Sequence, residues 1–235
     1  EEGRKRMRFE NYLKDAFERC DKMLQLLLEK ADAAAVIVTS DYGFFAAHSR
    51  LALNKLLADA GLRVGSAETS EVIAITSSIS ANIYLNLAGR EPKGAVMPQD
   101  YDATLEKIIS ACRNYRDAAT GEHVFDEVRR FSELPGLKLE HDHAGDVWVR
   151  LKPGYTFRGD VGPAKPLVDQ PRFLGEHGYA PAAAQSKGIF LSFGPIAMPP
   201  VSQEVDAIDV AATVSAMLGI ASPEGAQGRN VLSRN

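Results

Sequence analysis

Residues 36–45, VIVTSDYGFF, constrain the fold of this chain more than any other stretch. The run begins with β-branched apolar residues, which favour a strand buried on both faces of a parallel sheet. It stops at Asp41 and Tyr42, and Gly43 allows a tight turn there. Ligands of open α/β sheets bind just beyond the carboxyl ends of strands, so Asp41 is a candidate metal ligand. A turn or helix N-cap aspartate is the alternative interpretation.

Helical and strand-like patterns alternate along the rest of the chain. Apolar residues at three- and four-residue steps predict helices over 9–30, 49–62, 100–117 and 204–220. Apolar or alternating runs predict strands within 71–87, 123–131, 145–157 and 187–195, the first of these with a Ser-rich loop in its middle. We therefore expect an α/β fold, with a mostly parallel sheet flanked by helices.

Composition narrows the class of protein. The 235 residues are 45% hydrophobic and 25% charged, with a net charge of −4, as in ordinary globular proteins. We expect no nucleic-acid polymer as partner, and no apolar run reaches the roughly 18 residues of a membrane span. The first twenty residues lack the apolar region of a signal peptide. Cytoplasm is the default location, and a secreted or periplasmic one stays compatible with a leader that precedes Glu1.

The two cysteines and most histidines suggest no chemistry of their own. Cys20 and Cys112 stand at apolar positions of helical patterns, which predicts buried thiols and no disulfide. The HDH triplet at 141–143 is interpreted as two surface histidines in a polar loop, and His48 and His123 as solvated. Phosphate-binding glycine loops, nucleophile elbows and zinc-protease motifs are all missing from the sequence.

His177 is the histidine that we single out. It lies in GEHGYAP, within a Gly-, Pro- and Ala-rich stretch over 159–185 that fits no regular element. Long irregular stretches inside a compact domain are often functional loops. A histidine between small and turn-forming residues has little local packing to satisfy, so it is either presented as a ligand or simply exposed.

These motifs, taken in order, resemble the type I phosphodiesterase and nucleotide pyrophosphatase branch of the alkaline phosphatase superfamily. The helix and strand LKDAFERCDKMLQLLLEKADAAAVIVTSDYG come first, followed by the helix LALNKLLADAGL. The strand pair TGEHVFDEVRR and GDVWVRLKPGY precedes the loop GEHGYAP, and the segments GIFLSFGP and AIDVAATVSAMLGI finish the set. The resemblance spans about residues 10–232 and implies an alkaline phosphatase-like core with an inserted, smaller α+β region.

The resemblance also implies a division of the chain. Residues 1–64 would form the first part of the C-terminal half of the catalytic α/β core. An inserted α+β subdomain over 65–160 would shape the substrate pocket. Residues 161–235 would return to the core and carry the metal-ligand loop.

Members of this family hold two divalent ions, usually zinc, with manganese or magnesium as alternatives. The resemblance assigns Asp41 to the ion beside the nucleophile and His177 to the ion that activates water. It makes Tyr42 a further candidate metal ligand. Glu176 and Tyr179 flank His177 and would contact the ligands or the substrate, unless they are solvated loop residues.

Two departures from the family pattern stand out. Tyr42 occupies the place of a family histidine, and a phenol with a pKa near 10 must lose its proton to bind a metal. The family's Thr or Ser nucleophile, an early Asp and an Asp-x-x-x-His pair lie upstream of the first helix, and this sequence contains no Asp-x-x-x-His. We expect no catalytic nucleophile in this chain, which would be a C-terminal fragment or one chain of a split enzyme.

The leading hypothesis is therefore the C-terminal portion of a metal-dependent phosphodiesterase or phosphatase acting on phosphate esters. Its partners would be a small phosphate-ester substrate and the N-terminal half of the same enzyme. Strand edges left open by a missing half would favour association with a complementary chain, and a homo-oligomer is the alternative. A non-catalytic binding or scaffold relative is the alternative that Tyr42 favours. Sulfatase, phosphonate hydrolase and phosphomutase are alternatives within the superfamily.

Overall fold

The computed structural model describes residues 2–31, 35–65, 70–134, 144–158, 167–169, 175–180, 182–194 and 204–232. The chain divides into two compact units. The first unit comprises residues 1–41 and 189–235, and the second comprises residues 42–188. None of the described helices is long and apolar enough to cross a membrane.

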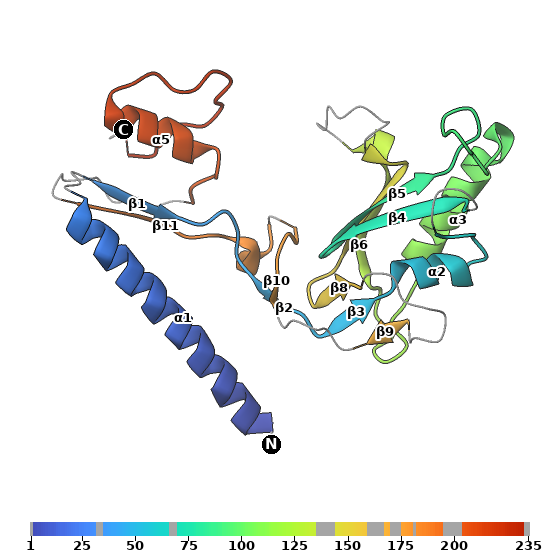
Figure 1. Cartoon of the computed structure of the whole chain (residues 1–235), viewed down its shortest axis with the longest axis horizontal. Helices are drawn as coiled ribbons and strands as arrows, with labels where there is room; N and C mark the ends of the chain where they lie inside the picture. The colour runs from blue at the N-terminus through green and yellow to red at the C-terminus, as the bar shows by residue number, and fades with distance from the viewer. Residues whose placement is uncertain are drawn as a thin grey trace. The chain divides into compact units, whose positions relative to one another are not determined.

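The first unit pairs two strands that are distant in the sequence in one small sheet. Its elements are α1 (Glu2–Lys30), β1 (Val36–Thr39), β11 (Phe190–Phe193) and α5 (Asp209–Leu218). β1 and β11 pair antiparallel, with Val36 opposite Phe193 and Thr39 opposite Phe190. Figure 1 shows these two strands side by side although about 150 residues separate them in the chain.

Most of the exposed large hydrophobic side chains belong to this first unit. On α1, the exposed fractions of Leu13, Phe17 and Leu27 are 62%, 74% and 65%. Among the described residues of the unit, Ala212 alone is a buried hydrophobic. The prediction of a buried thiol at Cys20 is wrong, because this cysteine lies on α1 and is exposed.

The C-terminal end of the first unit is held by two polar residues of α5. The Asp209 carboxylate is buried and accepts a hydrogen bond from the Arg229 backbone N–H at 2.9 Å. The Thr213 hydroxyl accepts one from the Val231 N–H at 3.1 Å. At Gly228 a Cβ atom would lie 2.0 Å from the Ile208 carbonyl oxygen, so only glycine permits this approach. Asp209 and Thr213 therefore tie the final loop to the helix.

The second unit contains most of the chain's regular structure. Its strands are β2 (Phe45–Ala46), β3 (Ser49–Leu51), β4 (Val72–Ser77), β5 (Ser80–Leu85), β6 (Phe125–Arg130), β7 (Val147–Leu151), β8 (Tyr155–Phe157), β9 (Val168–Asp169) and β10 (Gly175–Glu176). Its helices are α2 (Leu53–Asp59), α3 (Tyr101–Asn114) and the short 3₁₀ turns η1 (Pro98–Asp100), η2 (Phe131–Glu133) and η3 (Ala184–Ser186). The strands form an antiparallel sheet in the order β4-β5-β7-β6, a three-stranded sheet β8-β3-β9 and a two-stranded sheet β10-β2.

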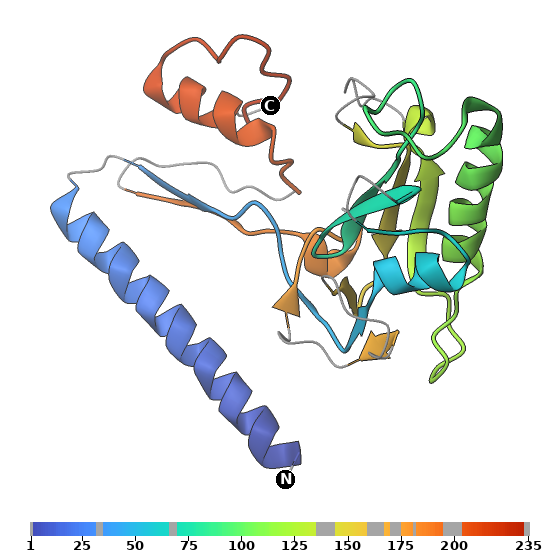
Figure 2. The same cartoon turned by 45° about the vertical axis from the view of Figure 1, so that its right-hand side comes forward.

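The core of the second unit lies between the four-stranded sheet and its helices. α3 runs along one face of that sheet, as two views of the molecule show (Figure 1, Figure 2). Leu105 and Ile108 of α3 pack in one cluster with Ile83 and Val149 of the sheet, and all four are buried. This cluster gives the second unit a hydrophobic core of its own.

One buried ion pair fastens a loop to the sheet in this unit. The Asp146 carboxylate accepts hydrogen bonds from the Arg90 guanidinium at 2.8 Å, the Tyr101 hydroxyl at 2.8 Å and the Leu85 N–H at 2.7 Å. Burial alone would raise the pKa of Asp146, but these hydrogen bonds outweigh it and lower that pKa. Tyr101 responds oppositely, since burial and the adjacent carboxylate raise its pKa to about 12.

The expectation of a mostly parallel sheet is wrong for the described residues, where β3 and β8 are the only pair of named strands that run parallel. An apolar run indicates burial but does not identify the partner strand. Residues 49–51 are a strand and not part of the helix expected over 49–62, because they pair with β8 and β9. The strand–loop–strand pattern over 71–87 is confirmed, with a turn at residues 78–79.

Candidate functional site

The GEHGY segment is built into the second unit on both sides of His177. Just before the histidine, β10 pairs with β2, so that Glu176 lies opposite Phe45. Just after it, Gly178 has a φ of 86°, a left-handed conformation that glycine adopts without strain. The sharp turn at Gly178 presents His177 at the end of a paired strand.

The Glu176 side chain is held by two hydroxyl groups. Ser78 donates a hydrogen bond to one carboxylate oxygen at 2.6 Å, and the Thr156 hydroxyl lies 3.0 Å from the other. A short O–H···O⁻ bond of this kind is charge-assisted and stronger than a neutral one. Glu176 is therefore a fixed, half-buried carboxylate and not a solvated loop residue.

Tyr179 anchors the segment on the other side. Its side chain is buried, its hydroxyl donates to the Tyr155 carbonyl at 2.7 Å, and its ring meets the Phe45 ring edge-on at 4.6 Å between centroids. Burial raises the pKa of Tyr179 to about 12, so the phenol stays protonated and serves as a donor. These contacts make Tyr179 part of the packing that holds the loop.

The imidazole of His177 lies against an aromatic pair from the segment after β1. The rings of His177 and Tyr42 stack with centroids 4.0 Å apart and planes 5° from parallel. Phe44 meets the His177 ring nearly perpendicularly at 5.6 Å, and 62% of the Phe44 side chain is exposed. The turn between Tyr42 and Phe44 requires glycine, because a Cβ at Gly43 would lie 2.0 Å from the Gln185 carbonyl oxygen.

The stacking geometry limits what these two rings can bind. A metal bound by an imidazole nitrogen lies in the ring plane, about 2.0–2.1 Å from the nitrogen. Since the Tyr42 ring is parallel to that plane in van der Waals contact, about 3.5–4.0 Å away, its oxygen cannot reach the same ion. The two side chains could therefore bind only separate ions. Paired catalytic ions lie about 3.5–4 Å apart, which is compatible with one ion at each ring.

The described residues do not make up a metal site by themselves. Within the described ranges, no three His, Cys, Asp or Glu side chains gather closely enough to hold a metal ion. Asp41 is exposed and ends the N-terminal segment of the first unit, whereas Tyr42 and His177 belong to the second. A complete metal site would need donors beyond these residues, and the role of His177 as a metal ligand stays a prediction.

The other histidines are placed differently. The His48 Nδ1 and the Ser49 hydroxyl share a hydrogen bond of 3.0 Å. The His48 ring lies edge-on to the Tyr155 ring, with centroids 4.9 Å apart. It covers Gly154, where a Cβ would lie 2.2 Å from the His48 Nε2. His123 stands beside the edge strand β6. The HDH triplet at 141–143 lies outside the described residues.

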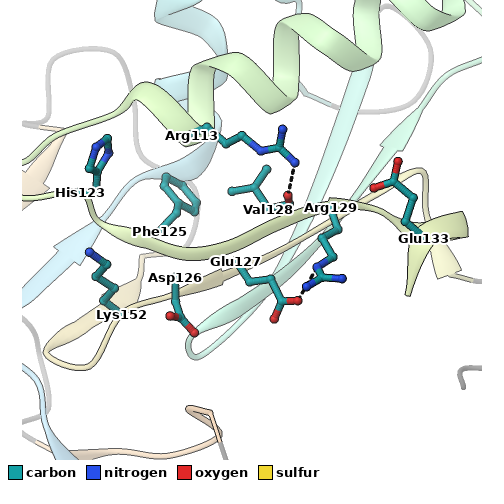
Figure 3. A pocket seen from close by; sticks show the side chains of 9 residues that line it. All are labelled: Arg113, His123, Phe125, Asp126, Glu127, Val128, Arg129, Glu133 and Lys152. Atoms are coloured by element: carbon teal, nitrogen blue, oxygen red, sulfur yellow. Dashed lines mark hydrogen bonds and ion pairs between the residues drawn. The ribbon is translucent and has the colours of Figure 1, made fainter. Parts of the chain in front are cut away.

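A groove of about 660 Å³ follows the edge strand β6. Figure 3 shows His123 and Lys152 near one end of the groove and Glu133 at the other, with Arg113 donating to the Val128 carbonyl between them. Two of its acidic residues are neutralised within the fold: Asp126 pairs with Arg150, and Glu127 pairs with both Arg129 and Arg150. None of the predicted site residues lines this groove.

Three residues of the His177 surroundings were missed by sequence reasoning: Ser78, Thr156 and Phe44. Ser78 lies in the predicted Ser-rich loop, but nothing in the local sequence indicates that its hydroxyl meets a carboxylate 98 residues later. The aromatic residues on both sides of Gly43 were a usable signal, because aromatic side chains prefer edge-to-face contacts, and Tyr42 and Phe44 make one at 5.8 Å between centroids.

A family model identifies the family of the chain, and a solved structure identifies its fold. The sequence model of the family described as type I phosphodiesterase / nucleotide pyrophosphatase matches residues 5–180. A solved structure of human ectonucleotide pyrophosphatase / phosphodiesterase 5 is similar with a TM-score of 0.58 and 16% identity, over 94% of this chain and 51% of that one. The murine protein of the same name gives a TM-score of 0.48 and 17% identity, over 80% of this chain and 42% of that one. No curated protein matches the sequence. The chain spans about half the length of these solved structures.

Proposed function

The chain belongs to the type I phosphodiesterase / nucleotide pyrophosphatase family, within the alkaline phosphatase superfamily, and we propose that it is the C-terminal portion of a metal-dependent hydrolase of phosphate esters. In this proposal the nucleophile and the remaining metal donors come from the N-terminal portion of the same fold. The family is typically metal-dependent, which makes a divalent ion, zinc before manganese or magnesium, the expected cofactor.

The observation that carries the proposal is the fixed presentation of His177. A single exposed histidine would point to no chemistry, but this imidazole is stacked on Tyr42 and its loop is anchored through Glu176 and Tyr179. Such preorganisation is what a metal ligand needs, because each donor must be held near its bonding position before the ion arrives. His177 would give one nitrogen to a divalent ion, and Asp41 would be a carboxylate donor at a second ion.

The surface of the first unit supports a missing portion of the fold. α1 leaves Leu13, Phe17 and Leu27 largely exposed, and the small sheet leaves Leu191 of β11 52% exposed. Apolar surface of this extent usually marks a protein interface. The other half of the family fold is the occupant that we propose, because the chain covers only half of the similar solved structure.

Reconstitution tests this function. The full 235-residue chain is assayed with bis(4-nitrophenyl) phosphate in the presence of Zn²⁺ or Mn²⁺, alone and after mixing with an N-terminal half of the family fold. We expect no turnover by the chain alone, and complex formation, bound metal and hydrolysis after mixing. His177→Ala should abolish turnover in the complex, and His123→Ala should not. Robust turnover by the chain alone would contradict the proposal.

A second candidate function is a non-catalytic binding or scaffold protein. Tyr42 favours it, because the phenol stacks on His177 where the family pattern has a histidine ligand. In that case the reconstituted complex would form but would bind no stoichiometric metal. A chain that forms only homo-oligomers, detected by light scattering, would argue against an N-terminal half as the partner in either function.

A further inference from the structure

Ser78 occupies a backbone position that disfavours serine. It is the first of two residues that join β4 to β5, since Ser77 pairs directly with Ser80. Its φ is 47°, and among the described residues no other residue except glycines has a positive φ. Glycine, asparagine or aspartate usually fills such a turn position, because the Cβ of other residues crowds the backbone. Residues held in this conformation often lie at functional sites.

The contacts of Ser78 explain how the conformation is maintained. Its carbonyl accepts the Phe157 N–H at 2.6 Å and lies 2.9 Å from the Thr156 hydroxyl. Its own hydroxyl reaches the Glu176 carboxylate at 2.6 Å. The turn is thus fixed on β8 by the backbone, and the serine side chain projects to Glu176. Replacing the serine by glycine would keep the backbone contacts and remove only that projection.

The Glu176 carboxylate is held at both oxygens. Ser78 bonds one oxygen, and Thr156 lies within hydrogen-bond distance of the other. No ion pair of Glu176 occurs among the residues that the structure describes, so these two hydroxyls carry its side-chain hydrogen bonding there. A carboxylate fixed in two directions also fixes the backbone from which it projects.

The residue after Glu176 is His177. Successive side chains of an extended segment point to opposite sides, so pinning Glu176 on one side orients the histidine toward the other. There the imidazole lies against Tyr42 with nearly parallel rings. We propose that Ser78 and Thr156 are positioning residues, which hold the His177 imidazole in place through Glu176. What the imidazole binds rests on the proposed function. The positioning of His177 by Ser78, Thr156 and Glu176 does not depend on that function.

NMR spectroscopy of the full chain tests whether Ser78 and Thr156 position the His177 ring, and it needs no metal or substrate. Stacking on Tyr42 should displace the His177 ring-proton resonances from their free values, and His177→Ala assigns them. Ser78→Gly should lose most of that displacement while the melting temperature stays close to that of the parent, because relief of backbone strain offsets the lost hydrogen bond. Thr156→Val should lose part of it.

Ser77→Ala is the matched control, since Ser77 is the exposed neighbour at the end of β4. It should leave the His177 resonances unchanged. Combining Ser78→Gly with Glu176→Ala should add nothing to the effect of Glu176→Ala alone, because both act on one contact. Unchanged His177 resonances in folded Ser78→Gly would overturn the proposal. Normal resonances with failed hydrolysis after reconstitution would instead count against the proposed function alone.

Discussion

Asp146→Asn should destabilise the second unit strongly. The substitution removes the charge from a carboxylate whose side chain is fully buried and which accepts bonds from Arg90, Tyr101 and the Leu85 N–H. Breaking a buried ion pair costs about 3–5 kcal/mol, because the remaining charge loses its partner. The Arg90 side chain is 21% exposed and keeps Glu91 as a partner, so we expect about 3 kcal/mol, the lower end of that range.

Thermal and urea unfolding at pH 7 measure this difference. For a unit of this size, about 3 kcal/mol corresponds to a fall in the melting temperature of about 6–12 °C. Asp126→Asn is the control, since the Asp126 carboxylate also bonds an arginine, Arg150, but is 35% exposed. A surface pair of that kind contributes about 0–1 kcal/mol.

The pH dependence gives a second measurement. The pKa of Asp146 is lowered in the folded state, so the carboxylate contributes its stability above the unfolded value of about 3.9. That contribution is lost as the pH falls through the folded pKa. The gap between parent and Asp146→Asn should therefore be full at pH 5–7 and shrink below about pH 4. A gap under about 1 kcal/mol at pH 7, or one that persists undiminished in acid, would refute the reasoning.

Three further predictions concern other parts of the chain. Cys20 should react rapidly with a thiol reagent such as 5,5′-dithiobis(2-nitrobenzoate), whereas Cys112, whose pKa burial raises to about 12, should react only on unfolding. Asp209→Ala should lower stability by about 1–3 kcal/mol and speed hydrogen exchange at the Arg229 amide, while leaving exchange in α3 unchanged. Tyr179→Phe should cost about 1 kcal/mol in urea unfolding, since the phenol loses its bond to a β8 carbonyl.

Local patterns in the sequence predicted the elements better than their arrangement. The strand at 36–39, the hairpin over 71–87 and the helix at 209–218 follow from periodicity and turn residues within a few positions. The pairing of β1 with β11 does not, because its partners lie about 150 residues apart and either direction buries an apolar strand. The prediction of a mostly parallel sheet was wrong for that reason.

The same limit applies to burial. The stripe on α1 predicts that one face of the helix is apolar, and Cys20 falls in that stripe. Periodicity cannot specify what covers the face, and here α1 is exposed along almost its whole described length. Cys112, in contrast, lies on α3, which packs on the four-stranded sheet, and its predicted burial is confirmed.

In the candidate site, too, the sequence indicated which residues matter but not which partners they contact. Sequence reasoning selected Asp41, Tyr42 and His177 from their places in motifs, and their roles as metal ligands stay predictions. It could not assign Glu176 and Tyr179, because their partners come from a turn and a strand distant in the chain. Tertiary contacts decide whether a polar residue beside a ligand is solvated or fixed.

The two units differ in what they need in order to function. The second unit has its own buried core, and every residue that holds His177 belongs to it. The first unit has almost no buried apolar side chain among its described residues and exposes a long apolar stripe. Stability in the first unit should therefore depend on a covering partner, whereas the orientation of His177 should not. Adding an N-terminal half should protect the amides of β1 and β11 from hydrogen exchange and leave the His177 ring-proton resonances unchanged. This result would separate assembly of the fold from orientation of the His177 ring.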